Sequence, residues 1–412
     1  MSAAGHARRM TTNTNILISG ASIAGPALAY WLRRHGFTPT VVERAPALRD
    51  GGYAVDFRGD VHFTVLRRMG ILADVERQRT HMGDMAHVNA AGKKVATIPS
   101  GMFSGDLEIL RGDLARILYD ATKDHTEYLF DDSITAITED ADGVEVTFER
   151  AAPRRFDLVV GADGLHSNVR ALAFGPDRDF IEDLGLHLAI FTVDNHLGLD
   201  HTGMMYGVPG KTVGVYSARN NTEAKALFHF GSPPLTYDRR DVQQQKKILA
   251  EAFDGVGWET PRLLAAMGDA PDFYFDSISQ VHLDTWSRGR VALLGDAAYS
   301  PSPLSGMGTG LAIVGAYVLA GELAAAGGDH RAGFAGYQEA MRDYVAGCQK
   351  AGQGVAKWTV PPENRFLAWF INQNYRLLPY IPWKGVFIKS IRKTASAITL
   401  KPYDQDLPAT RG

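Results

Sequence analysis

The stretch that decides the fold is Ile16-Leu17-Ile18-Ser19-Gly20-Ala21-Ser22-Ile23-Ala24-Gly25, an apolar run that ends in a glycine-rich turn. A helical pattern follows over residues 27–32, and Glu43 closes the next apolar run. This order of strand, turn, helix, strand and acid is a dinucleotide-binding fingerprint. The helix N-terminus would offer N–H groups to a pyrophosphate, and Glu43 would accept hydrogen bonds from a ribose. The predicted cofactor-binding turn comprises Gly20, Ser22, Ile23, Ala24 and Gly25.

The fingerprint has one irregular position and one ambiguous neighbour. Ser22 stands where a second glycine is usual, and although serine is small enough for close approach to a phosphate, it weakens the motif. A chance glycine-rich turn is therefore the alternative interpretation. Arg44, directly after Glu43, would lie near the adenine side of a cofactor or be a solvated charge at a strand end.

Two later segments repeat the order of strand, turn and helix. The first, residues 156–170, reads as a buried strand, a tight turn at Asp163-Gly164 and a helix. The second, residues 289–314, places Asp296 at the carboxyl end of a strand, where ligands of open α/β sheets bind. A plain strand–helix turn is the alternative for Asp163-Gly164, and a helix cap is the alternative for Asp296.

Taken together, the three segments resemble the single-component, class A FAD-dependent aromatic hydroxylases of the p-hydroxybenzoate hydroxylase type. That type includes the polyketide-tailoring and tetracycline-inactivating monooxygenases, and the resemblance covers roughly residues 14–350. This resemblance implies an α/β fold with an antiparallel sheet: a Rossmann-like FAD-binding domain, an inserted substrate-binding β-sheet domain and a C-terminal helical segment. Three departures are Ser22, Tyr299 where His is common, and Gly310 where Asn is common. We expect the last two close to the flavin ring.

The resemblance also implies how FAD would be held, without a covalent link. Asp163 and Gly164 would serve both FAD and a transient nicotinamide donor. Asp296, after Gly295, would contact the ribityl chain or the pyrophosphate. The loop that follows would turn N–H groups toward the N1–C2=O edge of the flavin, where negative charge develops on reduction. The loop residues concerned are Gly306, Met307 and Gly308.

Two arginines complete the predicted cofactor contacts. Arg111 matches the family's arginine before a helix that touches the flavin side, with a surface ion pair as the alternative. Arg58 would contact the cofactor or the donor, in a segment that would run past the other edge of the flavin.

The implied reaction is monooxygenation. NAD(P)H would reduce FAD as a transient co-substrate, since no second dinucleotide fingerprint follows a strand. The flavin would then take up O2 at C4a, and the hydroperoxyflavin would insert one oxygen atom into an aromatic or polyketide-like small molecule. The alternatives are a non-hydroxylating FAD-dependent reductase or oxidase, and a catalytically inactive FAD-binding chaperone or sensor. No catalytic residue is assigned; the candidates for a base are Tyr206, Tyr216, His187 and His229, each otherwise a packed strand residue.

Composition limits the other possibilities. The chain has 412 residues, 45% of them hydrophobic, and a net charge of −3, which favours two coupled domains and argues against a nucleic-acid partner. Its one cysteine and its histidine spacing predict neither disulfides nor a metal site. The first 15 residues lack the apolar segment of a signal peptide, and we expect no transmembrane helix. A cytoplasmic monomer or homodimer is predicted.

The domain boundaries follow from changes in pattern. Residues 14–175 and 284–350 form the two parts of the FAD-binding domain, and residues 176–283 are the inserted substrate-binding domain with strands near 186–193, 212–216 and 226–230. Residues 351–412 form a C-terminal helical lid or bridge. Its aromatic and basic stretch also fits a helix that binds a membrane surface or a partner, although prolines interrupt it.

Overall fold

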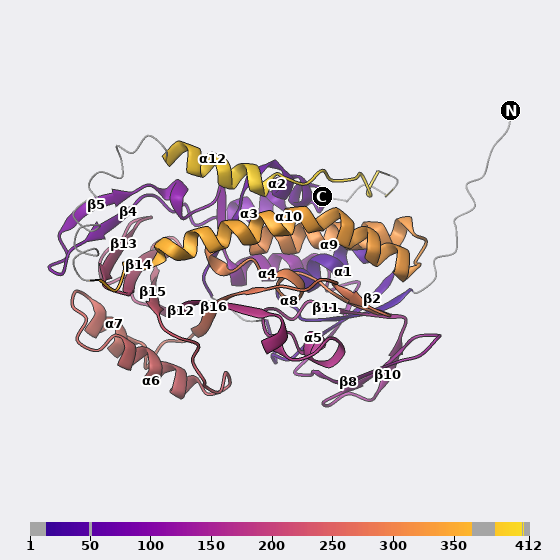
Figure 1. The fold of residues 1–412 in the computed structure, drawn as a ribbon. Helices are drawn as coiled ribbons and strands as arrows, with labels where there is room; N and C mark the ends of the chain where they lie inside the picture. Colours follow the sequence, from indigo (N-terminus) through magenta and orange to yellow (C-terminus); the bar gives the residue numbers. More distant parts are fainter. Residues whose placement is uncertain (1–13, 49–51, 365–383, 406, 408–412) are drawn as a thin grey trace.

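The computed structural model describes residues 14–48, 52–364, 384–405 and 407, and a six-stranded sheet lies at its centre (Figure 1). Every neighbouring pair of strands except β17 and β18 is parallel. Parallel strands packed on both faces are apolar throughout, as the fully buried strand β11 shows. In sheet order the strands are β17 (Ser287–Arg288), β18 (Val291–Leu293), β11 (Leu158–Gly161), β1 (Asn15–Ser19), β2 (Thr38–Glu43) and β7 (Glu127–Phe130).

A second large sheet has seven strands and contains the inserted region. The three strands expected there are present and pair antiparallel, which confirms the predicted combination of an α/β domain with an antiparallel sheet. The far edge of this sheet, however, comes from residues 85–98, which we had placed with the FAD-binding domain, because alternation does not reveal which sheet a strand joins. In sheet order the strands are β16 (Phe273–Val281), β12 (Ile181–Val193), β15 (Glu223–Gly231), β14 (Lys211–Ala218), β13 (Gly203–Val208), β4 (Met85–Val88) and β5 (Lys94–Ile98).

Two small sheets complete the strand content of the described residues. A two-stranded sheet pairs β3 (Ala54–Phe57) with β6 (Leu107–Leu110). A three-stranded sheet contains the hairpin predicted around Asp142-Gly143. Its strands are β8 (Ile134–Glu139), β9 (Val144–Phe148) and β10 (Arg154–Phe156).

Helices α1, α2 and α10 pack against α9, whereas α6 and α7 pack against the seven-stranded sheet. Short 3₁₀ turns lie at 100–102, 177–179 and 303–305. The helices are α1 (Ala24–Arg34), α2 (Gly59–Arg68), α3 (Leu72–Arg77), α4 (Arg111–Asp120), α5 (Asn168–Ala173), α6 (Val242–Ala252), α7 (Thr260–Ala266), α8 (Asp296–Tyr299), α9 (Gly308–Ala325), α10 (His330–Thr359) and α12 (Lys384–Ala395).

Helix α9 corrects one expectation. Its 18 residues are long and apolar enough, by length and composition alone, to cross a membrane, whereas we expected no such stretch. Within the fold, 78% of this segment is buried. A helix that is apolar on all sides is typical of a buried core position, and neighbouring helices cover α9.

The C-terminal region begins without a break in structure. Helix α10 continues from His330 to Thr359, through the expected boundary at residue 350. Helix α12 packs against α10 and α2, and its Arg392 forms an ion pair with Asp106 (Figure 1). The interrupting prolines and most of the aromatic stretch fall in residues 365–383, outside the described residues.

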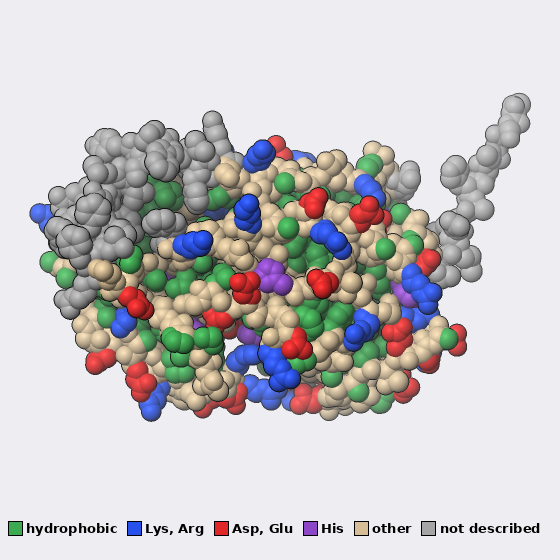
Figure 2. All heavy atoms as spheres, in the orientation of Figure 1, with side chains coloured by type: hydrophobic (Ala, Val, Ile, Leu, Met, Phe, Trp, Pro, Cys, Tyr) green, Lys and Arg blue, Asp and Glu red, His purple; other side chains and the backbone are tan. Residues whose placement is uncertain are grey.

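Acidic and basic side chains are interspersed on the face shown in Figure 2, as the small net charge suggested. The same face is hollowed below its middle, beside a group of Lys and Arg side chains.

Candidate active site

A cavity of about 1570 Å³ reaches from the loops of the central sheet to the seven-stranded sheet. Most of the predicted cofactor contacts line it, although they come from segments far apart in the chain. Gly25, Gly295 and Met307 do not line it; the Met307 side chain is in the core, and its N–H donates to Ser305 Oγ at 3.1 Å. The predicted residues that line the cavity are Gly20, Ser22, Ile23, Ala24, Glu43, Arg44, Arg58, Arg111, Asp163, Gly164, Asp296, Gly306 and Gly308.

The first glycine-rich turn is held tightly by backbone contacts. Gly20 has φ +106°, and a Cβ atom there would lie 2.6 Å from the Ala162 carbonyl oxygen. A Cβ atom on Gly25 would lie 1.9 Å from the Gly20 carbonyl oxygen. Helix α1 begins at Ala24 without a side-chain cap, so the fold presents an uncapped helix N-terminus at the cavity wall.

Glu43 braces this turn. One carboxylate oxygen accepts the Ala21 N–H at 2.8 Å, and the other accepts the Ala45 N–H at 2.9 Å. The acid expected to bind a ribose therefore also ties the end of β2 to the glycine-rich turn.

Asp163 has a comparable bracing role in the second turn. Its carboxylate accepts hydrogen bonds from Ser19 Oγ at 3.2 Å, from the Val169 N–H at 3.1 Å and from Ser167 Oγ. Burial raises the pKa of Asp163, although these hydrogen bonds oppose the shift. The adjacent Gly164 has φ +85° and open space where a Cβ would point, so its backbone can be approached closely from the cavity.

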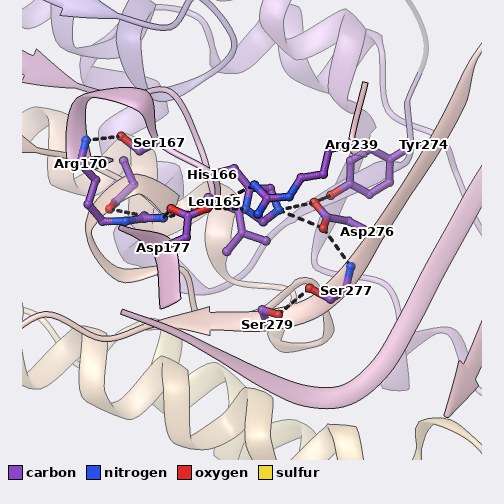
Figure 3. Close-up of polar contacts among 11 residues, drawn as sticks. Leu165, His166, Ser167, Arg170, Asp177, Arg239, Tyr274, Asp276, Ser277 and Ser279 are labelled. Atoms are coloured by element: carbon purple, nitrogen blue, oxygen red, sulfur yellow. Dashed lines mark hydrogen bonds and ion pairs between the residues drawn. The ribbon is translucent and has the colours of Figure 1, made fainter. Parts of the chain in front are cut away.

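His166, three residues after Asp163, links the second turn to the seven-stranded sheet (Figure 3). Its Nδ1 lies 3.0 Å from Asp177 Oδ2, and its Nε2 lies 3.0 Å from Asp276 Oδ1 on β16. Arg170, which is fully buried, also contacts Asp177, at 2.6 Å. Burial lowers the pKa of His166, but the hydrogen bonds to the two carboxylates outweigh it, so the net shift is upward. We did not assign His166 from the sequence, although it lies within the second motif.

In the third segment, residues 289–314, Asp296 lies near the start of α9, and the charge of Arg111 from α4 acts on it. Asp296 is the first residue of α8, and a Cβ on Gly308, at the start of α9, would lie 3.5 Å from Asp296 Oδ1. Burial raises the pKa of Asp296, and the charge of Arg111 opposes that shift. The guanidinium carbon of Arg111 lies 5.9 Å from the centre of the Tyr53 ring.

Arg58 faces the same loop from the opposite side. It is 6% exposed and forms an ion pair with Asp56 at 2.8 Å. Its Nε has no hydrogen-bond partner among the described residues, and a Cβ on Gly306 would lie 3.3 Å from it. A buried donor without a partner beside a cavity indicates that a ligand acceptor belongs there.

Of the four candidates for a base, two line the cavity. Tyr216 and His229 do so, and burial raises the pKa of Tyr216 and lowers that of His229 to about 4. Tyr206 and His187 are not among the lining residues. The His187 ring stacks on that of Phe230, with 5.3 Å between ring centres.

The two departures expected near the flavin ring, Tyr299 and Gly310, are not among the cavity-lining residues, although their neighbours Ser300 and Thr309 are. Both belong to contacts in which a glycine of α9 makes room for a ring. A Cβ on Gly310 would lie 2.0 Å from His62 Cε1, and a Cβ on Gly315 would lie 2.3 Å from the Tyr299 hydroxyl. Only the packed structure reveals these pairs, since the partners are distant in sequence.

The Gly310–His62 contact predicts that a side chain at position 310 lowers the free energy of unfolding. His62 accepts the Arg58 N–H at 3.1 Å and lies 2.7 Å from the Tyr344 hydroxyl, so its ring has little freedom to move. We expect Gly310→Ala to lower the free energy of unfolding in urea by about 1–3 kcal/mol. In a His62→Ala background the same change should be neutral or stabilising, because alanine is the better helix former.

Gly354 in α10 is the matched control for this experiment, because nothing lies within 4 Å of its Cβ position. Gly354→Ala should stabilise the protein by up to about 1 kcal/mol. Equal effects of Gly310→Ala and Gly354→Ala would show that the His62 contact is unimportant.

Comparisons with known proteins identify the family of the chain. Residues 13–359 match the family model described as an FAD binding domain. An uncharacterized protein of Mycobacterium tuberculosis is 51% identical over 336 residues, covering 80% of this chain and 90% of the relative. A flavin-dependent monooxygenase of Legionella longbeachae is 41% identical over 352 residues, covering 84% of this chain and 90% of the relative. The crystal structure of tetracycline destructase Tet(55) matches with a TM-score of 0.81 and 39% identity, covering 94% of this chain and 98% of that one.

The chain belongs to the FAD binding domain family, among the FAD-dependent monooxygenases. The resemblance to the class A FAD-dependent hydroxylases is thereby confirmed, and so are FAD binding and the enzyme class.

Proposed function

We propose that this enzyme uses NAD(P)H and O2 to insert one oxygen atom into an aromatic or polyketide-like small molecule. The observation that carries the proposal is a single cavity lined both by three glycine-containing turns and by one face of an antiparallel sheet. The turns suit a dinucleotide, and the sheet side suits a flat apolar ligand beside it. The apolar residues on that side include Met85, Ile98, Met102, Phe103, Leu188, Met205 and Leu227.

In this proposal FAD lies along the predicted contacts. The uncapped start of α1 faces its pyrophosphate, Glu43 and Arg44 lie at its adenosine end, and Asp296 lies near the ribityl chain. The unpartnered Nε of Arg58 donates to the cofactor or to a ligand beside it. When bound, FAD supplies the redox chemistry, which is acceptance of a hydride and activation of O2, while the protein orients the substrate and excludes water.

We also propose the domain boundaries, the cellular compartment and the oligomeric state. Residues 14–175 and 284–350 bind FAD, residues 176–283 together with β4 and β5 bind the substrate, and residues 351–412 form the lid or bridge. We place the enzyme in the cytoplasm as a monomer or homodimer. The name of one structural relative, tetracycline destructase, supports a polycyclic, hydroxyl-rich substrate and makes tetracycline a suitable first probe.

Labelling with heavy O2 tests the reaction. With NADPH and tetracycline as the probe, the product is expected to gain one oxygen atom that carries the label. Mass spectrometry of the product measures this, and anaerobic incubation is the control. An unlabelled product, or turnover that proceeds equally well without O2, would contradict the proposal and indicate that the enzyme is a reductase.

A further inference from the structure

Two carboxyl groups, the buried Asp56 and the half-buried Glu108, lie on opposite strands beside the cavity, and the charge of Arg58 acts on both. Asp56 on β3 and Glu108 on β6 are directly opposite in the antiparallel pair of strands, which places both side chains on the same face. Asp56 forms an ion pair with the guanidinium of Arg58 at 2.8 Å, and it also accepts a hydrogen bond from the Gly105 N–H at 2.9 Å. Glu108 instead accepts the neutral hydroxyl of Thr80 at 2.6 Å.

The distribution of these partners decides which acid holds a proton. Two adjacent carboxylates that are out of water cannot both ionise without a cost that one guanidinium offsets only in part. Burial raises the pKa of Asp56 and the Arg58 guanidinium opposes that shift, whereas Glu108 is bonded by the neutral Thr80 hydroxyl. Burial, and then the charge of Asp56, raises the pKa of Glu108 to about 7.

Glu108 also occupies a position between two spaces. It lines the large cavity, and it lines a second, polar pocket of about 310 Å³. Among the described residues, only Arg58, Met82 and Glu108 line both. The large cavity that Glu108 lines also contains the apolar residues of the proposed substrate region, whereas the smaller pocket is lined by Thr80, Ser104 and charged side chains.

We propose that Glu108 is the proton acceptor for a phenol or enol hydroxyl of the substrate, and that the smaller pocket connects it to solvent. In this step the substrate O–H bond breaks, its proton passes to a Glu108 carboxylate oxygen, and the electron pair stays on the substrate oxygen. The resulting oxyanion is the electron-rich form that an electrophilic oxygen attacks. The proton then leaves Glu108 to water in the smaller pocket. This inference rests on the monooxygenase function proposed above.

Three other groups near the cavity, His229, Tyr216 and Asp56, suit this role less well. His229 has a pKa of about 4, so it is a weaker proton acceptor near neutral pH than a group that titrates near 7. Burial raises the pKa of Tyr216 and keeps its hydroxyl protonated, and the Asp56 carboxyl group is already engaged by Arg58 at 2.8 Å. The charged and titratable groups that surround Glu108 are Asp56, Arg58, Arg79, His81, Asp106, Tyr216 and Arg392.

The test compares Glu108→Gln with the FAD-loaded wild-type enzyme and tetracycline as the probe. We expect the rate of oxygenation to fall about 100-fold, in the range found for loss of a general base. The wild-type rate should rise with pH through a limb near 7, and the variant should lose this limb. Flavin content and the rate at which NADPH reduces the flavin should stay the same, because Glu108 acts on the substrate. Glu145→Gln, which removes an exposed carboxylate on β9, is the control.

Infrared difference spectra separate failure of this inference from failure of the proposed function. The carbonyl band of a protonated carboxyl should be present in the wild type at pH 6, weaken as the pH rises through 7, and be absent in Glu108→Gln. If the variant keeps the rate and the pH limb, or if its infrared spectrum matches that of the wild type, the assignment of Glu108 is wrong. If the wild type does not oxygenate the probe but shows the titrating band, the proposed reaction on this probe fails while the proton on Glu108 stands.

Discussion

Gly25→Val is expected to yield a folded protein that binds FAD at least about 100-fold more weakly, a loss of about 2.7 kcal/mol. The new Cβ would overlap the Gly20 carbonyl oxygen, which is backbone and cannot rotate away. The overlap can be relieved only by moving the turn away from the start of α1, where the pyrophosphate would bind. Gly20→Val should behave alike, because φ +106° disfavours a branched side chain and its Cβ would meet the Ala162 carbonyl.

The measurement is the ratio of flavin to protein absorbance after purification, followed by titration of the apoprotein with FAD. Circular dichroism monitors folding. Ser22→Gly is the matched control within the same turn, since it removes a small side chain at the cavity wall and restores the usual glycine. It should keep full occupancy. Wild-type affinity in Gly25→Val would contradict the assignment of this turn to the cofactor.

Asp296→Ala should lower FAD affinity by about 10- to 100-fold, because a hydrogen bond to a charged group contributes about 1.5–3 kcal/mol. Asp296 lies at the carboxyl end of β18, beside the start of α9 and near Arg111, and it lines the cavity. Its removal would take away an acceptor at the point where the ribityl chain is proposed to lie. Asp296→Asn keeps an acceptor oxygen of similar shape, so its loss should be clearly smaller.

Titration of each apoprotein with FAD, followed by quenching of flavin fluorescence, compares the two variants. Equal losses in the Asn and Ala variants would assign the effect to the negative charge. Unchanged occupancy and activity in Asp296→Ala would exclude this segment from the cofactor site.

Local patterns predicted the cofactor half of the molecule well. Strands β1, β2 and β11, the turn at Gly20 and the turn at Asp163-Gly164 all form where the sequence indicated. These features depend on neighbours in the chain: an apolar run, a residue that tolerates positive φ, and a following helix start. The strands of the inserted sheet were found for the same reason.

Contacts between distant segments were not predictable in this way. Membership of β4 in the seven-stranded sheet depends on its pairing with β13, more than 100 residues further along the chain. The packing of Gly310 on His62 and of Tyr299 on Gly315 likewise joins residues that are distant in the chain, or nearly so, and appears only in the folded protein. Neither the alternation of a strand nor the composition of a helix encodes such partners.

The sequence by itself determined where the chain turns, which strands are buried and which family of folds results, since backbone conformation and hydrophobic periodicity are local properties. Only the tertiary structure decided which charged groups meet. His166 lies between Asp177 and Asp276, and Glu108 lies opposite Asp56, because sheets and loops from separate segments pack together there. Proton affinities in the site depend on those distances and on burial, and both arise only when the chain is folded.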